Sequence, residues 1–382
     1  MRILFITPWY PNEKNTVSGT YVLELAKAVS KFCSVCVFHS YPDSSVSHYT
    51  ITDTFEDEIR VVRVKCPATV IPIVSHASLY YRSYYEFCKL IQDFKPDIIH
   101  AHVYKAGIAG SIAGKKFHIP VIITEHAEII DRFQKRRGQC VLNFFKVRMA
   151  RFAYNGADCV IAVSESLKSY LIQNKIRKKI IVVPNIVNTG LFSPSDGTMN
   201  NLQKNILFVG GLTPVKGLLF LFDAIASLKN KRDDFILNII GDGLMRSEYE
   251  SYVKSAGIAN KVLFHGAKTK ELTSDFMKRC DFLVLPSIYE TFGIVLIEAM
   301  ACGKPVISTN SGGQKEFINE RNGVLIPPGD SKSLMDAIDF MLDNSRYYSP
   351  DIISHDITER FSYSSIGDQM RKIYSSYIRD TK

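Results

Sequence analysis

The sequence has its strongest chemical signal in a pair of glutamates, Glu290 and Glu298, separated by seven residues. Glu290 follows an apolar strand pattern over residues 282–287, whereas Glu298 lies on a helical pattern that Gly303 and Pro305 end. The first N–H groups of a helix have no intrahelical partner and carry the positive end of its dipole, so this turn suits an anion. Phosphate between two sugar-binding carboxylates is typical of a nucleotide-sugar site. The alternative is a capping glutamate followed by a solvent-exposed helical one.

A second glycine-containing turn, residues 209–217, also follows a strand pattern and opens a helical one. Gly210 and Gly211 let the backbone approach a ligand closely, and Lys216 supplies a mobile positive charge that suits a diphosphate. The residue order is not that of a Walker A loop, and an ordinary turn with a surface lysine is an equal alternative. Two further glycine turns follow strand patterns, at residues 241–243 and 311–313.

In the first half of the sequence, candidate ligand-binding residues stand at the ends of predicted strands. Gly19 lies in the loop of residues 15–20, where we expect it to contact a phosphate or the reacting sugar. A histidine at a strand end can donate to a sugar hydroxyl or carry a proton near neutral pH. We assign that role to His126, and we interpret His100 and His102 as hydrogen-bonded structural residues.

Short apolar runs alternate with amphipathic segments, which predicts parallel sheets covered by helices. Strands are predicted at residues 3–7, 35–39, 60–65, 97–100, 121–124 and 159–162, and then at 205–209, 236–240, 262–265, 282–286, 305–308 and 323–326. Helices are predicted near residues 21–30, 80–94, 106–116, 140–154 and 364–379. The turn-rich residues 184–190 and 193–197 indicate a linker between domains.

The length of 382 residues favours two domains. We predict an α/β protein with a Rossmann-like domain over residues 1–190 and a second one over residues 191–355. The remaining helical segment, residues 356–382, is a candidate to pack back on the first domain. Two successive doubly wound domains place a ligand in the cleft at the C-terminal ends of their strands.

The net charge of +9 is concentrated in the first half, where residues 1–190 hold 25 Lys and Arg against 15 Asp and Glu. This balance favours an anionic partner such as a membrane surface, a lipid phosphate or a nucleic acid, and a merely soluble basic face is equally compatible. The basic and aromatic residues 143–152 fit either a helix resting on an anionic membrane or a basic helix whose phenylalanines face the core. Four further basic residues precede them, Arg132, Lys135, Arg136 and Arg137.

No apolar run approaches the ~20 residues that span a bilayer. Residues 1–7 are too short for a signal peptide and are followed by Pro8, so we expect a cytoplasmic protein, with the inner face of the cell membrane as a candidate location. Cys33 and Cys36 form a lone C-x-x-C pair, which favours strand residues over a metal or redox site. The sequence has no D-x-D triplet, so we predict no bound metal and no cofactor.

Together these residues resemble the retaining GT-B glycosyltransferases of glycosyltransferase family 4 (group 1), over nearly the whole chain. The most specific match is the E-x7-E run of residues 290–298, followed by Ala-Met-Ala-Cys-Gly-Lys-Pro-Val-Ile at residues 299–307. Weaker matches are the linker and the glycine-containing segments at residues 184–190, 209–217, 241–243, 311–313 and 322–328.

The resemblance implies that Glu290 contacts the hydroxyls of the donor sugar and that Glu298 binds the ribose hydroxyls. Lys216 would bind the diphosphate, His126 would lie beside the donor sugar, and Gly19 would lie near the phosphate. The sugar and the phosphate would also be held by the backbone of four consecutive residues, Phe292, Gly293, Ile294 and Val295.

Two positions depart from the family pattern. The family often has an arginine five residues before the lysine, where this sequence has Gly211, so one phosphate contact is missing or comes from elsewhere. The loop of the first domain has one glycine, Gly19, where many members have two.

The leading hypothesis is therefore a metal-independent enzyme that moves a sugar, with retention, from a UDP- or GDP-linked donor to the hydroxyl of a saccharide or lipid-linked acceptor. Cell-surface polysaccharide or glycolipid synthesis is the expected context. One alternative is an epimerase or phosphorylase on the same fold. Another is a non-catalytic sugar-nucleotide binding subunit, which Gly211 favours and the two glutamates oppose. Nucleic-acid binding has the least support, because no recognised module accompanies the basic half.

Overall fold

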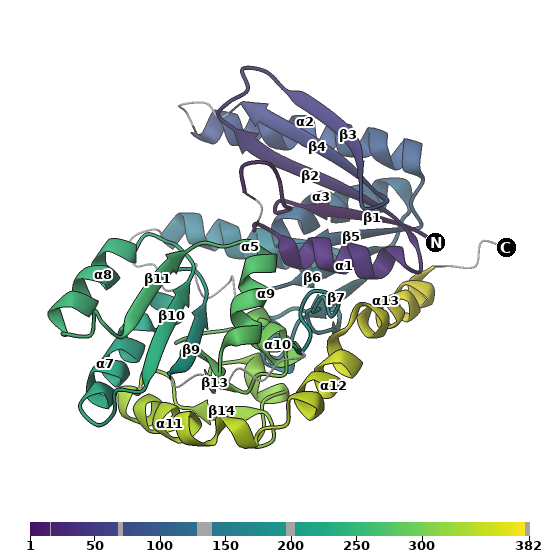
Figure 1. The fold of residues 1–382 in the computed structure, drawn as a ribbon. Coiled ribbons are helices and arrows are strands. Elements are labelled where there is room, and N and C mark those ends of the chain that lie inside the picture. Colours follow the sequence, from purple (N-terminus) through teal and green to yellow (C-terminus); the bar gives the residue numbers. More distant parts are fainter. Residues whose placement is uncertain (16, 68–71, 128–139, 196–202, 379–382) are drawn as a thin grey trace. The chain divides into compact units, whose positions relative to one another are not determined.

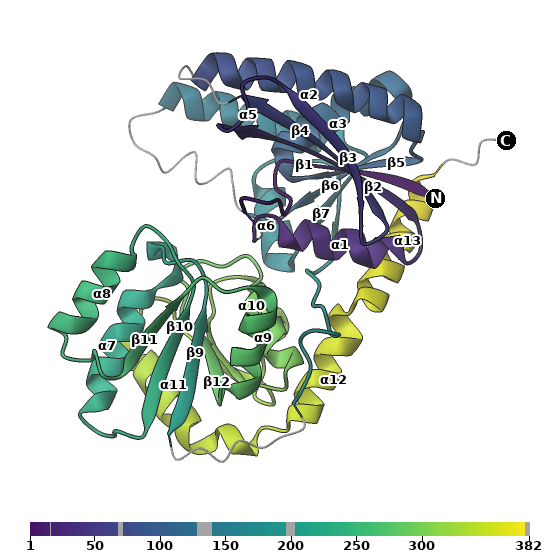
Figure 2. The same ribbon diagram turned by 45° about the horizontal axis from the view of Figure 1, so that its top comes forward.

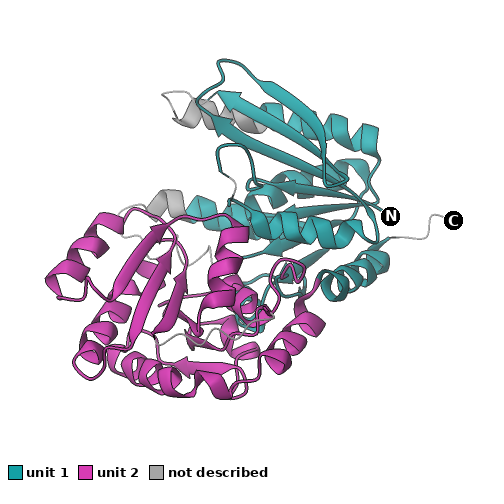
Figure 3. Cartoon of the chain, viewed as in Figure 1, with its two compact units in different colours: residues 1–186, 363–382 teal, residues 187–362 magenta. Residues whose placement is uncertain are grey.

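The computed structural model describes residues 1–15, 17–67, 72–127, 140–195 and 203–378, without the side chains of residues 72–80 and 140–143. The chain forms two compact units, one of residues 1–186 and 363–382 and one of residues 187–362 (Figure 3). The predicted basic residues Arg132, Lys135, Arg136 and Arg137 lie outside the described residues.

The first unit is built on an eight-stranded sheet with the order β3-β4-β2-β1-β5-β6-β7-β8 (Figure 1). All neighbouring strands are parallel except β3 and β4, which pair antiparallel. The strands are β1 (Arg2–Thr7), β2 (Ser34–Asp43), β3 (Thr50–Glu56), β4 (Ile59–Pro67), β5 (Ile98–His102), β6 (Val121–Glu125), β7 (Cys159–Ala162) and β8 (Lys179–Val182).

Helices cover both faces of this sheet because its central strands are apolar on both sides. One face carries α2, α3 and α5, and the other carries α1 and α13 (Figure 2). The helices of the unit are α1 (Thr20–Ser30), α2 (Pro72–Phe94), α3 (Val103–Phe117), α5 (Cys140–Gly156), α6 (Glu165–Gln173) and α13 (Tyr363–Tyr377). The C-terminal α13 packs on α1, with Ile366, Met370 and Tyr374 in the core of the first unit.

The second unit has a six-stranded parallel sheet with the order β11-β10-β9-β12-β13-β14. Its strands are β9 (Lys204–Val209), β10 (Phe235–Ile240), β11 (Val262–Gly266), β12 (Phe282–Leu285), β13 (Val306–Thr309) and β14 (Gly323–Ile326). Its helices are α7 (Leu218–Lys229), α8 (Arg246–Ser255), α9 (Lys270–Arg279), α10 (Ile294–Ala301), α11 (Ser331–Asn344) and α12 (Pro350–Phe361). Helix α7 packs on α11, and α10 packs on α9 and α12.

The predicted strands are all present, and the two-domain α/β fold is confirmed. The sequence prediction missed β3, whose residues are mostly polar or exposed, and β8, which has four residues. It also missed α6, and it started the helix α2 at residue 80 instead of Pro72. No helix in the described part of the chain is both long and apolar enough to cross a bilayer.

Candidate functional site

The turn between β12 and α10 is the centre of the candidate site in the second unit. Gly293 precedes α10 with φ +88°, a left-handed conformation in which a side chain is strained. A Cβ at this position would also lie 2.7 Å from Leu296 Cδ1. The N-cap residue Gly293 has no side chain that could accept from the first turn of α10, so this helix start suits an anion at the N–H groups of Ile294 and Val295.

Phe292 supports this turn from within the core. Its side chain is 2% exposed, and its ring centroid lies 5.2 Å from that of Phe317 and 5.8 Å from that of Phe361. The side chain therefore cannot contact a ligand in this arrangement, and only the backbone of Phe292 can. The aromatic cluster fixes the direction of the N–H groups that follow.

Lys216 and Glu290 are brought together from two loops that are 74 residues apart. The Nζ atom of Lys216 lies 2.6 Å from Oε2 of Glu290, and the two side chains are 25% and 14% exposed. Glu290 Cγ lies 3.5 Å from the position that a Cβ of Gly293 would take. A cation and a carboxylate therefore adjoin the N-terminus of α10.

The loop that carries Lys216 is tied to the loop that carries Glu290. Lys216 ends the short 3-10 helix η1 (Pro214–Lys216), and the Val215 carbonyl accepts a 2.9 Å hydrogen bond from the N–H of Ile288. Gly217 follows with φ +69°, where a Cβ would lie 2.1 Å from the carbonyl oxygen of Pro286. Only glycine allows this close approach of the two backbones.

A third turn supports the backbone of Glu290. Gly312 forms an isolated parallel bridge with Glu290, and a Cβ on Gly312 would lie 1.7 Å from the Glu290 carbonyl oxygen. Nearby, the Thr309 hydroxyl donates a 2.5 Å hydrogen bond to the carbonyl of Ser287. The predicted glycine turn at residues 311–313 therefore positions Glu290.

Glu298 lies on α10 and is buried, with 7% of its surface exposed. Its Oε1 lies 3.6 Å from Nζ of Lys270, the first residue of α9. The sequence prediction did not include Lys270, because no motif surrounds this residue. The two predicted carboxylates therefore each adjoin a lysine: Glu290 does so before the start of α10, and Glu298 does so about one turn into the helix.

The two glycines of the turn after β9 differ in their surroundings. A Cβ at Gly210 would lie 3.2 Å from Phe208 Cζ and 3.9 Å from Lys216 Cε, so Gly210 is next to the lysine. Gly211 is exposed, and a Cβ there would meet only the Asp242 carbonyl oxygen, at 3.9 Å. The described backbone around Gly211 therefore leaves room for a Cβ, although the sequence has no side chain there.

In the first unit, His126 follows β6 and is half-buried. Its ring centroid lies 4.1 Å from that of Tyr21, and its Nε2 lies 3.4 Å from Nδ1 of His102. Burial lowers the pKa of His126 to about 3, and a hydrogen bond with Asn185 opposes this effect. The ring is therefore neutral at pH 7 and can exchange hydrogen bonds with a sugar hydroxyl without carrying a charge.

Gly19 immediately precedes α1, with φ +70°. A Cβ at Gly19 would lie 2.1 Å from the carbonyl oxygen of Trp9. Only glycine therefore allows the backbone at position 19 to lie this close to the segment that follows β1. Gly19 and His126 belong to the first unit, whereas the other predicted site residues belong to the second. Among the described residues, no group of three His, Cys, Asp or Glu side chains could hold a metal ion.

The histidines at the end of β5 are part of the core. His100 lies 2.7 Å from the Tyr374 hydroxyl and 2.7 Å from the Thr124 hydroxyl. Burial lowers the pKa of His100 to about 3, and burial also places the pKa of His102 well below its usual value. Beside them, burial raises the pKa of the Glu125 carboxyl to about 7.

These groups predict a pH-dependent stability. A histidine with a lowered pKa contributes stability that is present above pH ~6.5 and is lost as the pH falls toward the folded-state pKa. The raised pKa of Glu125 acts in the opposite direction, because its contribution is lost as the pH rises from about 4.5 through 7. From His100, His102 and His126, opposed by Glu125, we expect unfolding between pH 6.5 and 5 to take up about two protons, each worth ~1.4 kcal/mol per pH unit. The buried His39, whose pKa is lowered by burial to about 4, adds to this uptake.

Urea unfolding at several pH values measures this dependence. The Glu125→Gln variant should lose the opposing contribution and show a steeper fall in the free energy of unfolding below pH 6.5. A stability that is constant between pH 5 and 7 in both proteins would contradict the prediction.

Comparisons with known proteins agree with this geometry. The family "Glycosyltransferase Family 4" matches residues 18–191, and the family "Glycosyl transferases group 1" matches residues 195–355. An uncharacterized glycosyltransferase of Methanocaldococcus jannaschii is 32% identical over 285 residues, which cover 73% of this chain and 75% of that protein.

Two further proteins are similar over most of their length. The UDP-Gal:alpha-D-GlcNAc-diphosphoundecaprenol alpha-1,3-galactosyltransferase of Escherichia coli is 26% identical over 305 residues, 75% of this chain and 76% of that protein. The structure of Anabaena HepE in complex with UDP-glucose has a TM-score of 0.76 and 23% identity, and covers 98% of this chain and 100% of that one. The chain therefore belongs to the group 1 glycosyltransferases of family 4: it has a two-domain, Rossmann-like GT-B fold and transfers a sugar from a nucleotide-sugar donor.

Proposed function

We propose that this enzyme transfers a sugar, with retention and without a metal ion, from a UDP- or GDP-linked donor to a lipid-linked or saccharide acceptor. The observation that carries the proposal is the arrangement around α10. Lys216 and Glu290 adjoin its N-terminus, and Glu298 lies about one turn further along the helix. A nucleoside diphosphate sugar has its diphosphate between the sugar and the ribose. An anion site with a hydroxyl-binding carboxylate on each side suits this order of groups.

In the proposed complex, the N–H groups of Ile294 and Val295 and the ammonium of Lys216 hold the diphosphate. Glu290 accepts hydrogen bonds from the sugar hydroxyls, and Glu298 accepts them from the ribose. UDP is the favoured nucleotide, because one relative is named for a UDP-galactose donor and one neighbouring structure contains UDP-glucose.

Retention then follows from substitution on one face of the sugar. The bond from the anomeric carbon to the phosphate oxygen breaks, and the bond to the acceptor oxygen forms on the same side. The acceptor proton passes to the departing diphosphate. The protein stabilises the leaving negative charge through Lys216 and the start of α10, and no covalent nucleophile is needed.

The proposed acceptor is lipid-linked, as in cell-surface polysaccharide or glycolipid synthesis. One relative is named for an acceptor of the diphosphoundecaprenol type. The proposal therefore includes a peripheral position at the inner face of the cell membrane, where such an acceptor is presented.

A second candidate is a non-catalytic sugar-nucleotide binding subunit, which one observation favours. Gly211 stands where family members often have arginine, so this position supplies no side-chain cation for the leaving group. The paired Lys216 and Glu290 favour catalysis instead.

A thermal-shift series with UDP, GDP, ADP and their sugar conjugates, in EDTA, tests donor binding first. We expect one nucleotide to stabilise the protein, by about 2.7 kcal/mol at 100 times its Kd. The donor that binds is then incubated with membrane lipid extract and, separately, with saccharide acceptors, and NMR of the product reports the anomeric configuration. Inversion would overturn the retaining mechanism, dependence on added Mg²⁺ would overturn metal independence, and binding without turnover would support the non-catalytic subunit.

A further inference from the structure

Helix α5 of the first unit is apolar on two opposite sides. Its inner side, which includes Val147, Ala150, Ala153 and Tyr154, is buried and faces α3 and the sheet. Its outer side carries four large apolar side chains that are about half exposed or more, namely Phe144 (62%), Phe145 (57%), Met149 (47%) and Phe152 (48%). The interpretation that the phenylalanines of this segment face the core is therefore wrong for these three.

This exposure is unusual for a helix that packs on a sheet from one side. Such a helix normally places polar residues on the side away from the core. Positions 144, 145, 148, 149 and 152 follow the spacing of one helical face, and Arg148 is the single charged residue among them. The rings of Phe144 and Phe145 are 6.0 Å apart between centroids. We define these five residues as the outer α5 face.

Helix α5 and the neighbouring helix α3 contain basic residues and no acidic ones. Helices α3 and α5 pack on each other, and neither contains an Asp or a Glu. Each contributes three basic residues: Lys105, Lys115 and Lys116 on α3, and Lys146, Arg148 and Arg151 on α5. Lys115 links the two helices, because its Nζ lies 5.9 Å from the centroid of the Phe152 ring.

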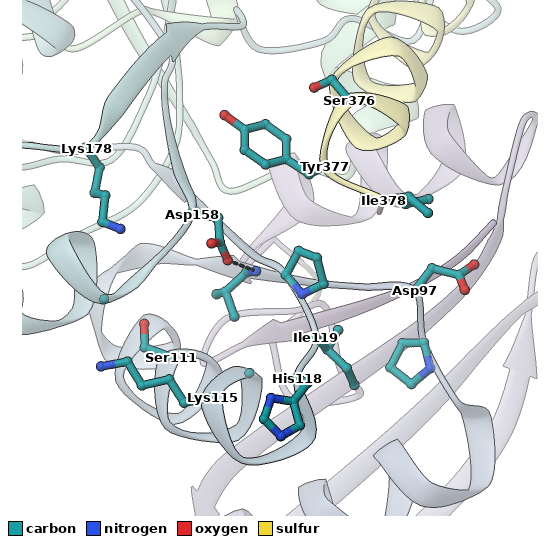
Figure 4. Close-up of a pocket in the computed structure, with 15 residues that line it drawn as sticks. Asp97, Ser111, Lys115, His118, Ile119, Asp158, Lys178, Ser376, Tyr377 and Ile378 are labelled. Atoms are coloured by element: carbon teal, nitrogen blue, oxygen red, sulfur yellow. Dashed lines mark hydrogen bonds between the residues drawn. The ribbon is translucent and has the colours of Figure 1, made fainter. Parts of the chain in front are cut away.

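The same lysine lines a hollow of about 710 Å³ at the end of α3. Lys115 and Lys178 both line this hollow, where Figure 4 shows them on the same side, so positive charge is also present beyond Lys115. The hollow also contains two carboxylates, and both are engaged by the backbone. Asp158 accepts a hydrogen bond from the N–H of Val121 at 2.8 Å, and Asp97 accepts one from the N–H of Arg2 at 2.7 Å.

From these observations we infer that the outer α5 face docks on an anionic lipid bilayer. The phenylalanines and the methionine enter the boundary between headgroups and acyl chains, and Lys115 of α3 and Arg148 meet the lipid phosphates. The side chains of Phe and Met offer no hydrogen-bonding group for nucleotide bases, whereas acyl chains need none. The absence of carboxylates from both helices selects an anionic surface over a neutral one.

The inference deepens the proposed lipid-linked acceptor and rests on that proposal for its biological meaning, but its test needs no transfer assay. The purified protein is sedimented with phosphatidylcholine vesicles, with and without phosphatidylglycerol, at low and high salt. We expect binding to the anionic vesicles at low salt, and a loss of most of it at high salt or without phosphatidylglycerol. No binding to anionic vesicles at low salt would overturn the inference.

Matched variants locate the contact. Phe145→Ser should weaken vesicle binding roughly tenfold, whereas Phe55→Ser, at a phenylalanine that is 75% exposed on β3 of the same unit, should not. Arg148→Glu should also weaken binding, and Arg321→Glu, an exposed arginine of the second unit, serves as its control.

Two other results would assign the surface differently. Equal binding of Phe145→Ser and the unaltered protein would exclude the outer α5 face. A dimer in light scattering that Phe145→Ser dissociates would show that a second copy of the chain covers it. In all variants, the thermal shift with the nucleotide-sugar donor reports whether donor binding, on which the proposed function depends, is intact, so failure of either proposal is recognised separately.

Discussion

Glu290→Ala should fold normally and lose most of its turnover, with kcat reduced by about 10²- to 10³-fold. In the proposed complex the carboxylate holds the hydroxyls of the sugar whose anomeric bond breaks. It also holds Lys216 Nζ at 2.6 Å, so the substitution removes a sugar contact and frees the cation at the same time. Glu290→Gln keeps the shape of the side chain and separates the loss of charge from the loss of volume.

The measurement is nucleotide release with the donor found by the thermal-shift series and the acceptor found in the incubation that follows it, together with the melting temperature of each variant. Glu320→Gln, at an exposed glutamate of the same unit, is the control and should retain full activity. Unchanged kcat in Glu290→Ala would remove Glu290 from the site. A large fall in melting temperature would instead mark it as a structural residue.

The turn around Glu290 could be predicted because its cause is local. The apolar residues of β12, the glycine that precedes α10 and the two glutamates at fixed spacing all lie within residues 282–298. The same holds for the glycine turns at strand ends, because parallel strands bring their C-terminal ends to one edge of the sheet. Gly312, which the sequence marks only as a turn residue, is in contact with Glu290 for this reason.

What the sequence could not predict are the contacts between distant segments. The partner of Lys216 is 74 residues away, and Lys270 meets Glu298 only because α9 and α10 pack side by side. The exposure of the outer α5 face could not be predicted from the sequence for the same reason. Its helical spacing is compatible with phenylalanines turned inward or outward, and the small inner residues Ala150 and Ala153 decide the outcome by packing on α3.

Lys216→Ala should lower kcat/KM by about 10²- to 10³-fold and should weaken the binding of nucleoside diphosphates. Lys216 is the cation that adjoins the start of α10, and Gly211 supplies none where the family often has arginine. The loss should therefore be larger for UDP than for uridine, which carries no phosphate. Calorimetry with both ligands measures this difference, and Lys254→Ala, at an exposed lysine on α8, is the control.

The double variant Lys216→Ala/Glu290→Gln decides whether the two residues act together. The charged atoms of the two residues are 2.6 Å apart, so the activity losses of the two single variants should not be additive in free energy. The double variant should be nearly as active as the less active of the two single variants. Independent losses that multiply would show that Lys216 serves the diphosphate and Glu290 the sugar with no coupling between them. Unchanged UDP affinity in Lys216→Ala would show that the N–H groups of α10 bind the diphosphate without Lys216. The glycine at position 211 would then be consistent with a phosphate site that needs no side-chain cation.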